Sequence, residues 1–407
     1  MSSFKTNNYF QQLDALRGIL SIIVFTTHLK LCSIYLAYAS MHIFFILSTF
    51  LVSKSLLSDK RKDNCPDYNT KLFLLKRIGR IAPVYFLYLL ILLAANILIS
   101  FLSKESNSFL TDFKQFGWMH FCFIYNFREL IQLFSMQHYE LISLMTPHLW
   151  SVSFEVQLYF MIFIFIFFFK KETIIRLTYF IIPFIILLRI GAYFLLQHYT
   201  SDQHLIVYLI QRNPIFHIDI IFYGFILVFV PLKNEKLIRY LLISTTILLF
   251  SIGFIFPYLT GKIQGITYAD AIHQDKYIYA YHSIFYLDNL INIFTFLLVG
   301  YMINFRGRIN LFNNKLLVRL GEYSYPTYIF QMLLIGIGYT AIGILIIIKI
   351  PKISTVLFYI LSGVLMWNIA YYGSRFIHRK LELPLLRQKD NLIAWYETEH
   401  KQLNSDL

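Results

Sequence analysis

The sequence predicts an all-α integral membrane protein, a polytopic helical bundle of about ten transmembrane helices with both termini in the cytoplasm. Three observations predict this class. The 407 residues are 57% hydrophobic, and only 14% of them are charged. Apolar stretches near 81–102, 149–169 and 177–196 approach or exceed the roughly 20 residues that span a bilayer as a helix. Lysine and arginine gather in every second connection between such stretches, which is typical of cytoplasmic loops.

Ten spans can be assigned from hydropathy along the chain. Their expected bounds are 13–31, 36–54, 80–102, 149–169, 177–196, 214–231, 238–257, 284–304, 323–347 and 353–374. The first span is too long for the apolar region of a signal peptide and lacks a small-residue cleavage site, so we expect it to remain as an anchor. This assignment gives a cytoplasmic N-terminal tail (1–12), a transmembrane domain (13–374) and a cytoplasmic C-terminal tail (375–407).

The charge distribution argues against a nucleic-acid partner. The net charge is +14, but the basic residues alternate between connections instead of covering one soluble domain, so they indicate topology. Cys32, Cys65 and Cys122 show neither a CxxC motif nor a metal-ligand spacing, so we expect no redox chemistry and no bound metal. The polar connection 58–76 is expected to be flexible, and the final residues 388–407 to be a solvated tail.

Arg17 and His28 are the first pair that could carry chemistry. Eleven helical steps separate them, which brings both side chains to one face of the first span, about 16 Å apart along its axis. Because ionisable residues are costly in lipid, this face is expected to line a polar pathway in the protein interior. The structural alternatives are that Arg17 reaches the lipid phosphates and that His28 caps the helix at the interface.

Arg77 and Arg80 stand at the cytoplasmic entrance of the third span. Their i, i+3 spacing places them on one helical face. Two guanidinium groups can hold a phosphate bidentately, which a lone lysine cannot do. The pair therefore predicts a phosphate site, and the alternative is that it only contributes to the cytoplasmic charge pattern.

Ser151 and Glu155 stand one helical turn apart near the start of the fourth span. A carboxylate inside an apolar span must be paired or protonated. Span arithmetic places Glu155 at the depth of His28, and a carboxylate beside an imidazole supports a general base. A purely structural hydrogen bond is the alternative. His217 and Asp219 are also polar enough to face the interior, without an assigned role.

Together these segments resemble the acyltransferase 3 family of membrane-bound O-acyltransferases. Six stretches match the family's motifs in order along nearly the whole chain. They are 13–18 with His28 (LDxLRG…H), 42–51 (FFxLSGF), 77–83 (RxxRixP), 148–159 (HLWSLxxEEQFY), 320–331 (LGxxSYxxYLxH) and 382–384 (ExP). Each motif alone is weak, but six in the right order make the resemblance specific.

The chain departs from the family's pattern at four positions. Thr49 replaces the usual glycine, so the approach of the backbone there is expected to differ. Val156 replaces a second glutamate and leaves Glu155 as the carboxylate of its motif. Gln331 stands where relatives usually have histidine, which removes acid–base chemistry at that position, and His42 stands where relatives often have an acidic residue.

The resemblance implies that acyl-CoA, commonly acetyl-CoA, is the donor substrate and that no cofactor is bound permanently. The acyl group would pass to a hydroxyl of a cell-surface glycan or a lipid-linked saccharide such as lipopolysaccharide, at the outer face of a bacterial inner membrane. Arg77, Arg80 and the deeper Arg17 would hold the phosphates of the donor. Some relatives carry an SGNH domain. This chain has none, so transfer would be done by the core or completed by a separate periplasmic transferase.

The catalytic roles fall on His28, Glu155 and Ser151. His28 would remove the proton from the acceptor hydroxyl or become transiently acylated. Glu155 would orient His28, and Ser151 would either position Glu155 or donate to the oxyanion. Two alternative functions are open. A transporter of a glycolipid or acyl carrier would also need buried charges and a basic entrance, and a glycan polymerase or ligase would act on lipid-linked sugars and leave their acyl content unchanged.

Overall fold

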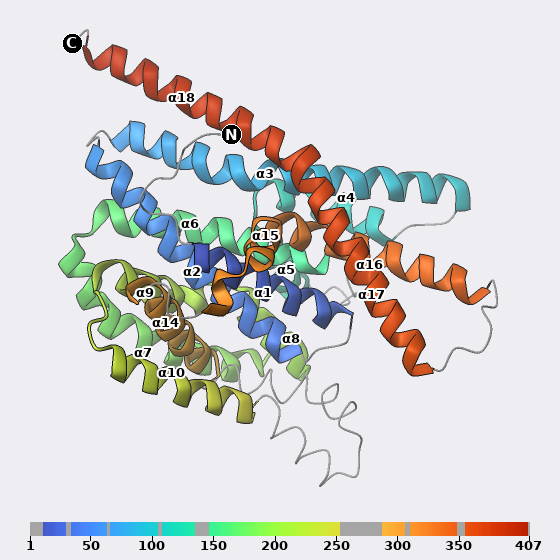
Figure 1. The fold of residues 1–407 in the computed structure, drawn as a ribbon, viewed down its shortest axis with the longest axis horizontal. Helices are drawn as coiled ribbons and strands as arrows, with labels where there is room; N and C mark the ends of the chain where they lie inside the picture. Colours follow the sequence, from blue (N-terminus) through green and yellow to red (C-terminus); the bar gives the residue numbers. More distant parts are fainter. Residues whose placement is uncertain are drawn as a thin grey trace. The chain divides into compact units, whose positions relative to one another are not determined.

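The computed structural model describes residues 11–29, 34–62, 66–104, 108–134, 146–252, 287–305, 310–347 and 355–405. The described residues form helices and no strands, which confirms the predicted all-α class (Figure 1). The chain divides into two compact units. Unit 1 comprises Met1–Asp59, Asn126–His138 and Phe154–Gly321, and unit 2 comprises Lys60–Tyr125, Tyr139–Ser153 and Glu322–Leu407.

Unit 1 is built around α9, a short helix that is apolar all round apart from Asp219 in its first turn. Its main elements are α1 (Gln11–His28), most of α2 (Ile34–Lys62) and of α6 (Trp150–Phe168), α5 (Arg128–Phe134), α7 (Lys171–Leu196), α8 (Gln203–Arg212), η3 (Pro214–His217), α9 (Ile218–Phe229), α10 (Glu235–Phe250), α14 (Asp288–Asn304), η6 (Asn310–Asn313) and α15 (Lys315–Glu322). A helix that is apolar all round has to be buried. α9 packs against both α7 and α14, and α14 also packs against α10 and α1.

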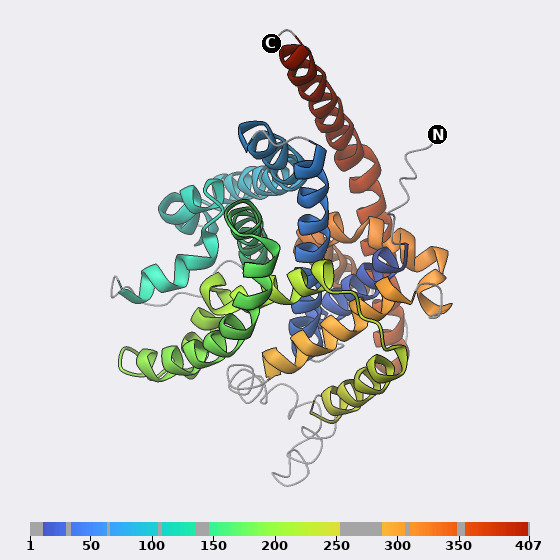
Figure 2. The ribbon, with the colours of Figure 1, turned by 90° about the vertical axis from the view of Figure 1, so that its left-hand side faces the viewer.

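Unit 2 is organised along the long helix α3. Its elements are α3 (Pro66–Ser103), α4 (Ser108–Phe121), η2 (Pro147–Leu149), α16 (Ser324–Ile347), α17 (Thr355–Ile377), the π-helical turn η7 (His378–Glu382) and α18 (Leu383–Ser405). α4, α16 and α18 contact α3, and α16 packs along α17. Figure 2 shows α18 in dark red as one long helix that leads to the C-terminus.

Each of the ten predicted spans coincides with a helix, although fewer meet the length and hydropathy expected of a membrane span. The qualifying helices are Leu36–Asp59, Thr70–Ser103, Trp150–Phe168 and Lys171–Leu196. A fifth span arises if the bent pair Leu205–Arg212 and Pro214–Phe229, with 65° between its halves, is counted as one. The chain is therefore a multi-pass membrane protein, while the number of ten spans and the cytoplasmic termini remain predictions.

Two polar segments that the sequence suggested to be flexible or solvated are largely helical. In the connection 58–76, α2 continues to Lys62 and α3 begins at Pro66, where proline's fixed φ suits the first helical turn. The C-terminal residues form α18, which packs along α3 and extends to Ser405. Polar composition alone cannot separate a loop from a helix that extends beyond the apolar zone. Most of the described residues after 388 are exposed, as expected of a solvated tail, and the flexibility of the connection 58–76 stays a prediction.

Two glycines in the sequence motifs permit a backbone contact between α1 and α15. A Cβ atom built on Gly18 would lie 2.2 Å from the carbonyl oxygen of Leu317, and one on Gly321 would lie 1.8 Å from that of Asp14. Real Cβ atoms do not approach backbone oxygens so closely, so only glycine fits at either position. The glycines of the first and fifth motifs are therefore explained by helix packing.

Thr49 shows how the chain accommodates its departure from the family's glycine. Its side chain is fully buried on α2, and its hydroxyl donates to the carbonyl of Phe45 at 2.9 Å. It faces Gly224 of α9, where an added Cβ would lie 2.4 Å from Cγ2 of Thr49 and 2.6 Å from its Cβ. The close approach of α2 and α9 is kept because the glycine stands on the partner helix.

This packing predicts that Gly224→Ala destabilises the protein and that Thr49→Gly restores stability in the double variant. Overpacking should cost about 1–3 kcal/mol in the single variant, and the double variant should be more stable than the sum of the two single effects. Thermal unfolding of the purified protein would measure both. Gly191→Ala is the control, because nothing lies within 4 Å of its Cβ position. Additive effects at Thr49 and Gly224 would contradict the proposed contact.

Candidate functional site

His28 lies at the C-terminal end of α1 in unit 1, with its side chain half-buried. Its Nδ1 atom lies 3.0 Å from the carbonyl oxygen of Val24. A carbonyl only accepts, so Nδ1 carries a proton and donates it, and the neutral ring then has its lone pair on Nε2. A backbone carbonyl of the same helix thus fixes the tautomer, a role that the sequence had suggested for Glu155.

Arg17 lies on the same continuous helix, so the predicted shared face with His28 follows from the observed geometry of α1. Its side chain is 15% exposed, and its Nη1 lies 3.5 Å from Oδ1 of Asp14, one turn earlier. That contact is long for a charge-assisted hydrogen bond.

Glu155 is held by two hydroxyl donors from unit 1. Ser48 Oγ of α2 donates to its Oε1 at 2.9 Å, and the Tyr159 hydroxyl, one turn later on α6, donates to the same oxygen. Stacked rings of Phe45 and Phe154, with centroids 4.5 Å apart, pack α2 against α6 beside these bonds. Across the described ranges of the chain, no hydrogen bond or ion pair joins Glu155 to His28.

Ser151 belongs to a hydrogen-bonded group of unit 2 instead. Its Oγ lies 2.6 Å from the hydroxyl of Tyr328 on α16 and 3.1 Å from the carbonyl oxygen of His148. The Tyr328 hydroxyl also donates to that carbonyl at 2.8 Å, and Nε2 of His148 bonds the carbonyl of Ile329 at 2.9 Å. These bonds tie the start of α6 to α16 and join the fourth and fifth motifs.

Arg77 and Arg80 lie on one face of α3 in unit 2, half-buried and exposed respectively. Gly79 between them lies against α18, where its Cβ position is 3.0 Å from Cγ of Lys389. Helix α18 thus packs against the side of α3 that carries Gly79, which the helical spacing places away from Arg77. The ammonium of Lys389 lies 3.1 Å from the exposed carboxylate of Asp390. The two arginines can bind a polyanion such as the phosphates of a nucleotide-bearing donor.

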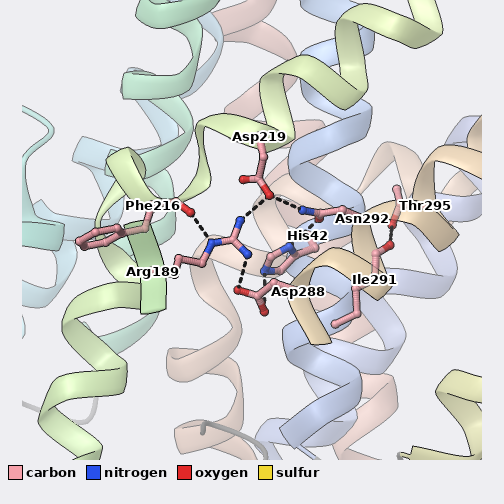
Figure 3. Close-up of polar contacts among 8 residues, drawn as sticks. All are labelled: His42, Arg189, Phe216, Asp219, Asp288, Ile291, Asn292 and Thr295. Carbon is pink, nitrogen blue, oxygen red and sulfur yellow. Dashed lines mark hydrogen bonds and ion pairs between the residues drawn. The ribbon is translucent and has the colours of Figure 1, made fainter. Parts of the chain in front are cut away.

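A buried polar cluster in unit 1 was not expected from the sequence. The guanidinium of Arg189 on α7, fully buried, forms ion pairs with Asp219 and Asp288, the latter at 3.5 Å, and donates from Nε to the carbonyl of Phe216 at 2.6 Å (Figure 3). Asn292 on α14 donates to Asp219 at 3.1 Å. The cluster ties α7, α9 and α14 together in the apolar interior.

The sequence did contain a signal for this cluster, namely charged residues inside apolar stretches, which an average hydropathy does not reveal. Arg189 lies inside the apolar stretch 177–196 and Asp288 inside 284–304. A charge within a membrane span is by default a candidate functional site. Asp219 was recognised as interior, and its partner Arg189 was missed because the two lie 30 residues apart in sequence.

Ionisable side chains buried among apolar helices are typical of membrane enzymes and transporters that bind a polar substrate. Residues 10–375, which are nearly the whole chain, match the family model of the acyltransferase 3 domain. The chain therefore belongs to this family and is a membrane acyltransferase. Neither a curated protein nor a solved structure matches the chain.

The hydrogen bonds of Glu155 predict a stability loss for Tyr159→Phe. The half-buried carboxylate would keep only the Ser48 donor, at a cost of about 1.5 kcal/mol, the lower end for a bond to a charged group. Tyr179→Phe is the control because that ring is 75% exposed. Thermal unfolding of both variants in the same detergent tests this, and equal unfolding temperatures would contradict the assigned bond.

Proposed function

We propose that this protein transfers an acyl group, most simply acetyl, from cytoplasmic acyl-CoA to a hydroxyl of a cell-surface glycan or lipid-linked saccharide at the outer face of a bacterial inner membrane. The observation that carries the proposal is the family match over residues 10–375, which contains His28 on the polar face of α1. The hydrogen bond from His28 Nδ1 to Val24 gives this histidine the tautomer of a base.

In the proposed reaction the acceptor hydroxyl attacks the thioester carbonyl of the donor while Nε2 of His28 takes the hydroxyl proton. The new C–O bond forms, the C–S bond breaks, and CoA leaves as a thiolate that takes a proton. A transient acyl-histidine is the alternative route, in which Nε2 itself attacks the thioester. Both routes require the unprotonated Nε2.

Glu155 is proposed as an acceptor-facing carboxylate in place of a direct partner of His28. Both of its hydrogen bonds use Oε1, so within the described residues Oε2 makes none. That oxygen is free to accept from an acceptor hydroxyl or to stabilise an imidazolium. Ser151 is proposed as a positioning residue, because its bond to Tyr328 ties the start of α6 to α16.

The proposed donor site uses Arg77 and Arg80 for the phosphates of CoA. Arg17 on α1 is proposed as a further ligand of the anionic donor. Fixed cations at an entrance raise the local concentration of an anionic substrate. Membrane lipids would surround the helices, and a separate periplasmic transferase could complete transfer to the final acceptor.

One observation favours the transporter alternative. The bent pair Leu205–Arg212 and Pro214–Phe229 is a broken span or a re-entrant loop, and discontinuous helices form the substrate sites of many transporters. Transport of a glycolipid or acyl carrier would leave the acyl content of the glycan unchanged. The amount of glycan at the surface would change instead.

Mass spectrometry of surface glycans and lipids separates these functions. Cells with the gene, without it, and with the His28→Ala variant are compared. Loss of one acyl mass per modified site in the deletion strain would support acyl transfer and identify both acyl group and acceptor. Unchanged acyl content with altered glycan amount or length would support transport or polymerisation.

The role of His28 predicts that His28→Ala abolishes acylation, a loss of at least about 100-fold for a general base, while membrane insertion is unchanged. His198→Ala is the matched control. His198 is exposed, and its Nδ1 lies 3.1 Å from a carbonyl four residues earlier, as in His28. Acylation is measured in membranes at matched protein levels. Full activity of His28→Ala would contradict the mechanism.

The donor site predicts that Arg77→Ala and Arg80→Ala each raise the KM for acyl-CoA about tenfold, which corresponds to about 1.4 kcal/mol of binding free energy. The lysine variants should recover part of this loss because they keep the charge without the bidentate fork. Arg176→Ala, an exposed arginine of α7, is the control. An unchanged KM with a lower kcat would place the arginines outside the donor site.

A further inference from the structure

His42, His217 and Asp288 bring three potential metal ligands together in the interior of unit 1. His42 lies on α2, His217 at the end of η3 and Asp288 at the start of α14, and all three side chains are almost completely buried. One ligand atom from each lies within 4.8 Å of the other two. Three segments distant in sequence thus point nitrogen and oxygen atoms at one place.

The protein groups around these ligand atoms satisfy them only weakly in the part of the chain that the structure describes. Both ring nitrogens of His217 and Oδ1 of Asp288 form no hydrogen bond of standard geometry, although backbone groups of Ile210 and Gln211 lie near His217 and the Tyr38 hydroxyl lies near Asp288. A poorly satisfied polar atom in the interior is costly, so such an atom calls for an explanation. The imidazole of His217 stands edge-on to that of His42, with ring centroids 5.4 Å apart.

The surrounding hydrogen bonds fix His42 in the form that binds a metal. The amide nitrogen of Asn292 can only donate, and it donates to Asp219, so its carbonyl oxygen faces His42 at 2.9 Å. Nδ1 of His42 must therefore donate to that oxygen. The lone pair of the neutral ring is then on Nε2, which faces Asp288 (Figure 3). A second-shell acceptor for the other ring nitrogen is typical of metal-binding histidines.

The spacing of His42 and Asp288 fits a shared ion better than a direct bond. Nε2 and Oδ1 are 3.9 Å apart. A charge-assisted hydrogen bond would close this distance to about 2.8 Å. Two ligands at about 2.1 Å from one tetrahedral zinc ion lie about 3.4 Å apart, so this pair would have to approach by only about 0.5 Å to share an ion.

The charges of the cluster also favour a cation. Arg189 supplies one positive charge against the two carboxylates of Asp219 and Asp288, so the cluster has an excess negative charge when both imidazoles are neutral. The guanidinium contacts Oδ2 of Asp288 while His42 faces Oδ1. The same carboxylate can therefore bind Arg189 and a metal ion together.

We propose that His42, His217 and Asp288 form a binding site for a divalent transition metal ion, with Zn²⁺ the best match to two imidazoles and one carboxylate. The three protein ligands leave a fourth coordination position for a small molecule. The ion would also link α2, η3 and α14. This departs from the expectation of no bound metal, which rested on cysteine spacing and could not detect ligands 175 and 71 positions apart along the chain.

Metal analysis of the purified full-length protein tests this proposal. Protein isolated without chelators should contain about one transition metal ion per chain, since the described residues provide one set of three ligands. His217→Ala and Asp288→Asn should lose it, and Asn292→Leu, which removes the second-shell acceptor, should weaken affinity about 10–100-fold. His120→Ala is the control, because His120 is equally buried but lies in unit 2, bonded to Tyr85.

Because a ligand variant could lose metal by misfolding, reconstitution of the wild-type protein is the second measurement. Chelated protein should take up Co²⁺ and develop the visible absorption of a four-coordinate cobalt ion, with a higher unfolding temperature that chelation reverses. Monodisperse wild-type protein that contains no transition metal and takes up neither Zn²⁺ nor Co²⁺ would overturn the proposal. Retention of the metal in both ligand variants would also overturn it. Neither result bears on acyl transfer, so the two proposals fail separately.

Discussion

The ion pairs of Arg189 with Asp219 and Asp288 are the interaction on which unit 1 depends. A guanidinium that is fully buried among apolar helices is tolerated only when carboxylates and carbonyls satisfy it, and removal of one partner of such a pair typically costs about 3–5 kcal/mol. Satisfying Arg189 requires α7, α9 and α14 to approach at one point. Asp219 also orients Asn292 and, through it, His42, so one arginine organises polar groups on four helices.

The residues proposed for catalysis meet the same requirement, that a buried ionisable side chain needs polar partners. Each ionisable side chain of the candidate site has its own local partner: His28 bonds a carbonyl of its own helix, Glu155 two hydroxyls, and Arg17 a carboxylate one turn earlier. These partners neutralise part of the cost of burial and leave Nε2 of His28 and Oε2 of Glu155 available for a substrate. A site held this way can react without first breaking a strong ion pair.

The sequence predicted the helical class and a helix at each expected apolar stretch, because apolar length acts locally along the chain. The shared face of Arg17 and His28 was also predictable, since both belong to one continuous helix. Contacts between distant segments could not be predicted. Glu155 accepts a hydrogen bond from Ser48, 107 positions away, and not from the expected His28. Hydropathy also gave no means of recognising that Gly224 compensates for Thr49, or that the polar residues after 388 continue a helix packed on α3.

The central claim is that the protein consumes acyl-CoA and acylates a saccharide, and purified protein in proteoliposomes tests it most directly. Acyl-CoA with a labelled acyl group is supplied together with a lipid-linked glycan acceptor, and free CoA and labelled glycan are measured over time. The account predicts that the two appear in equal amounts and that both require the acceptor. Movement of the glycan across the bilayer without release of CoA and without label in the glycan would contradict acyl transfer and support transport.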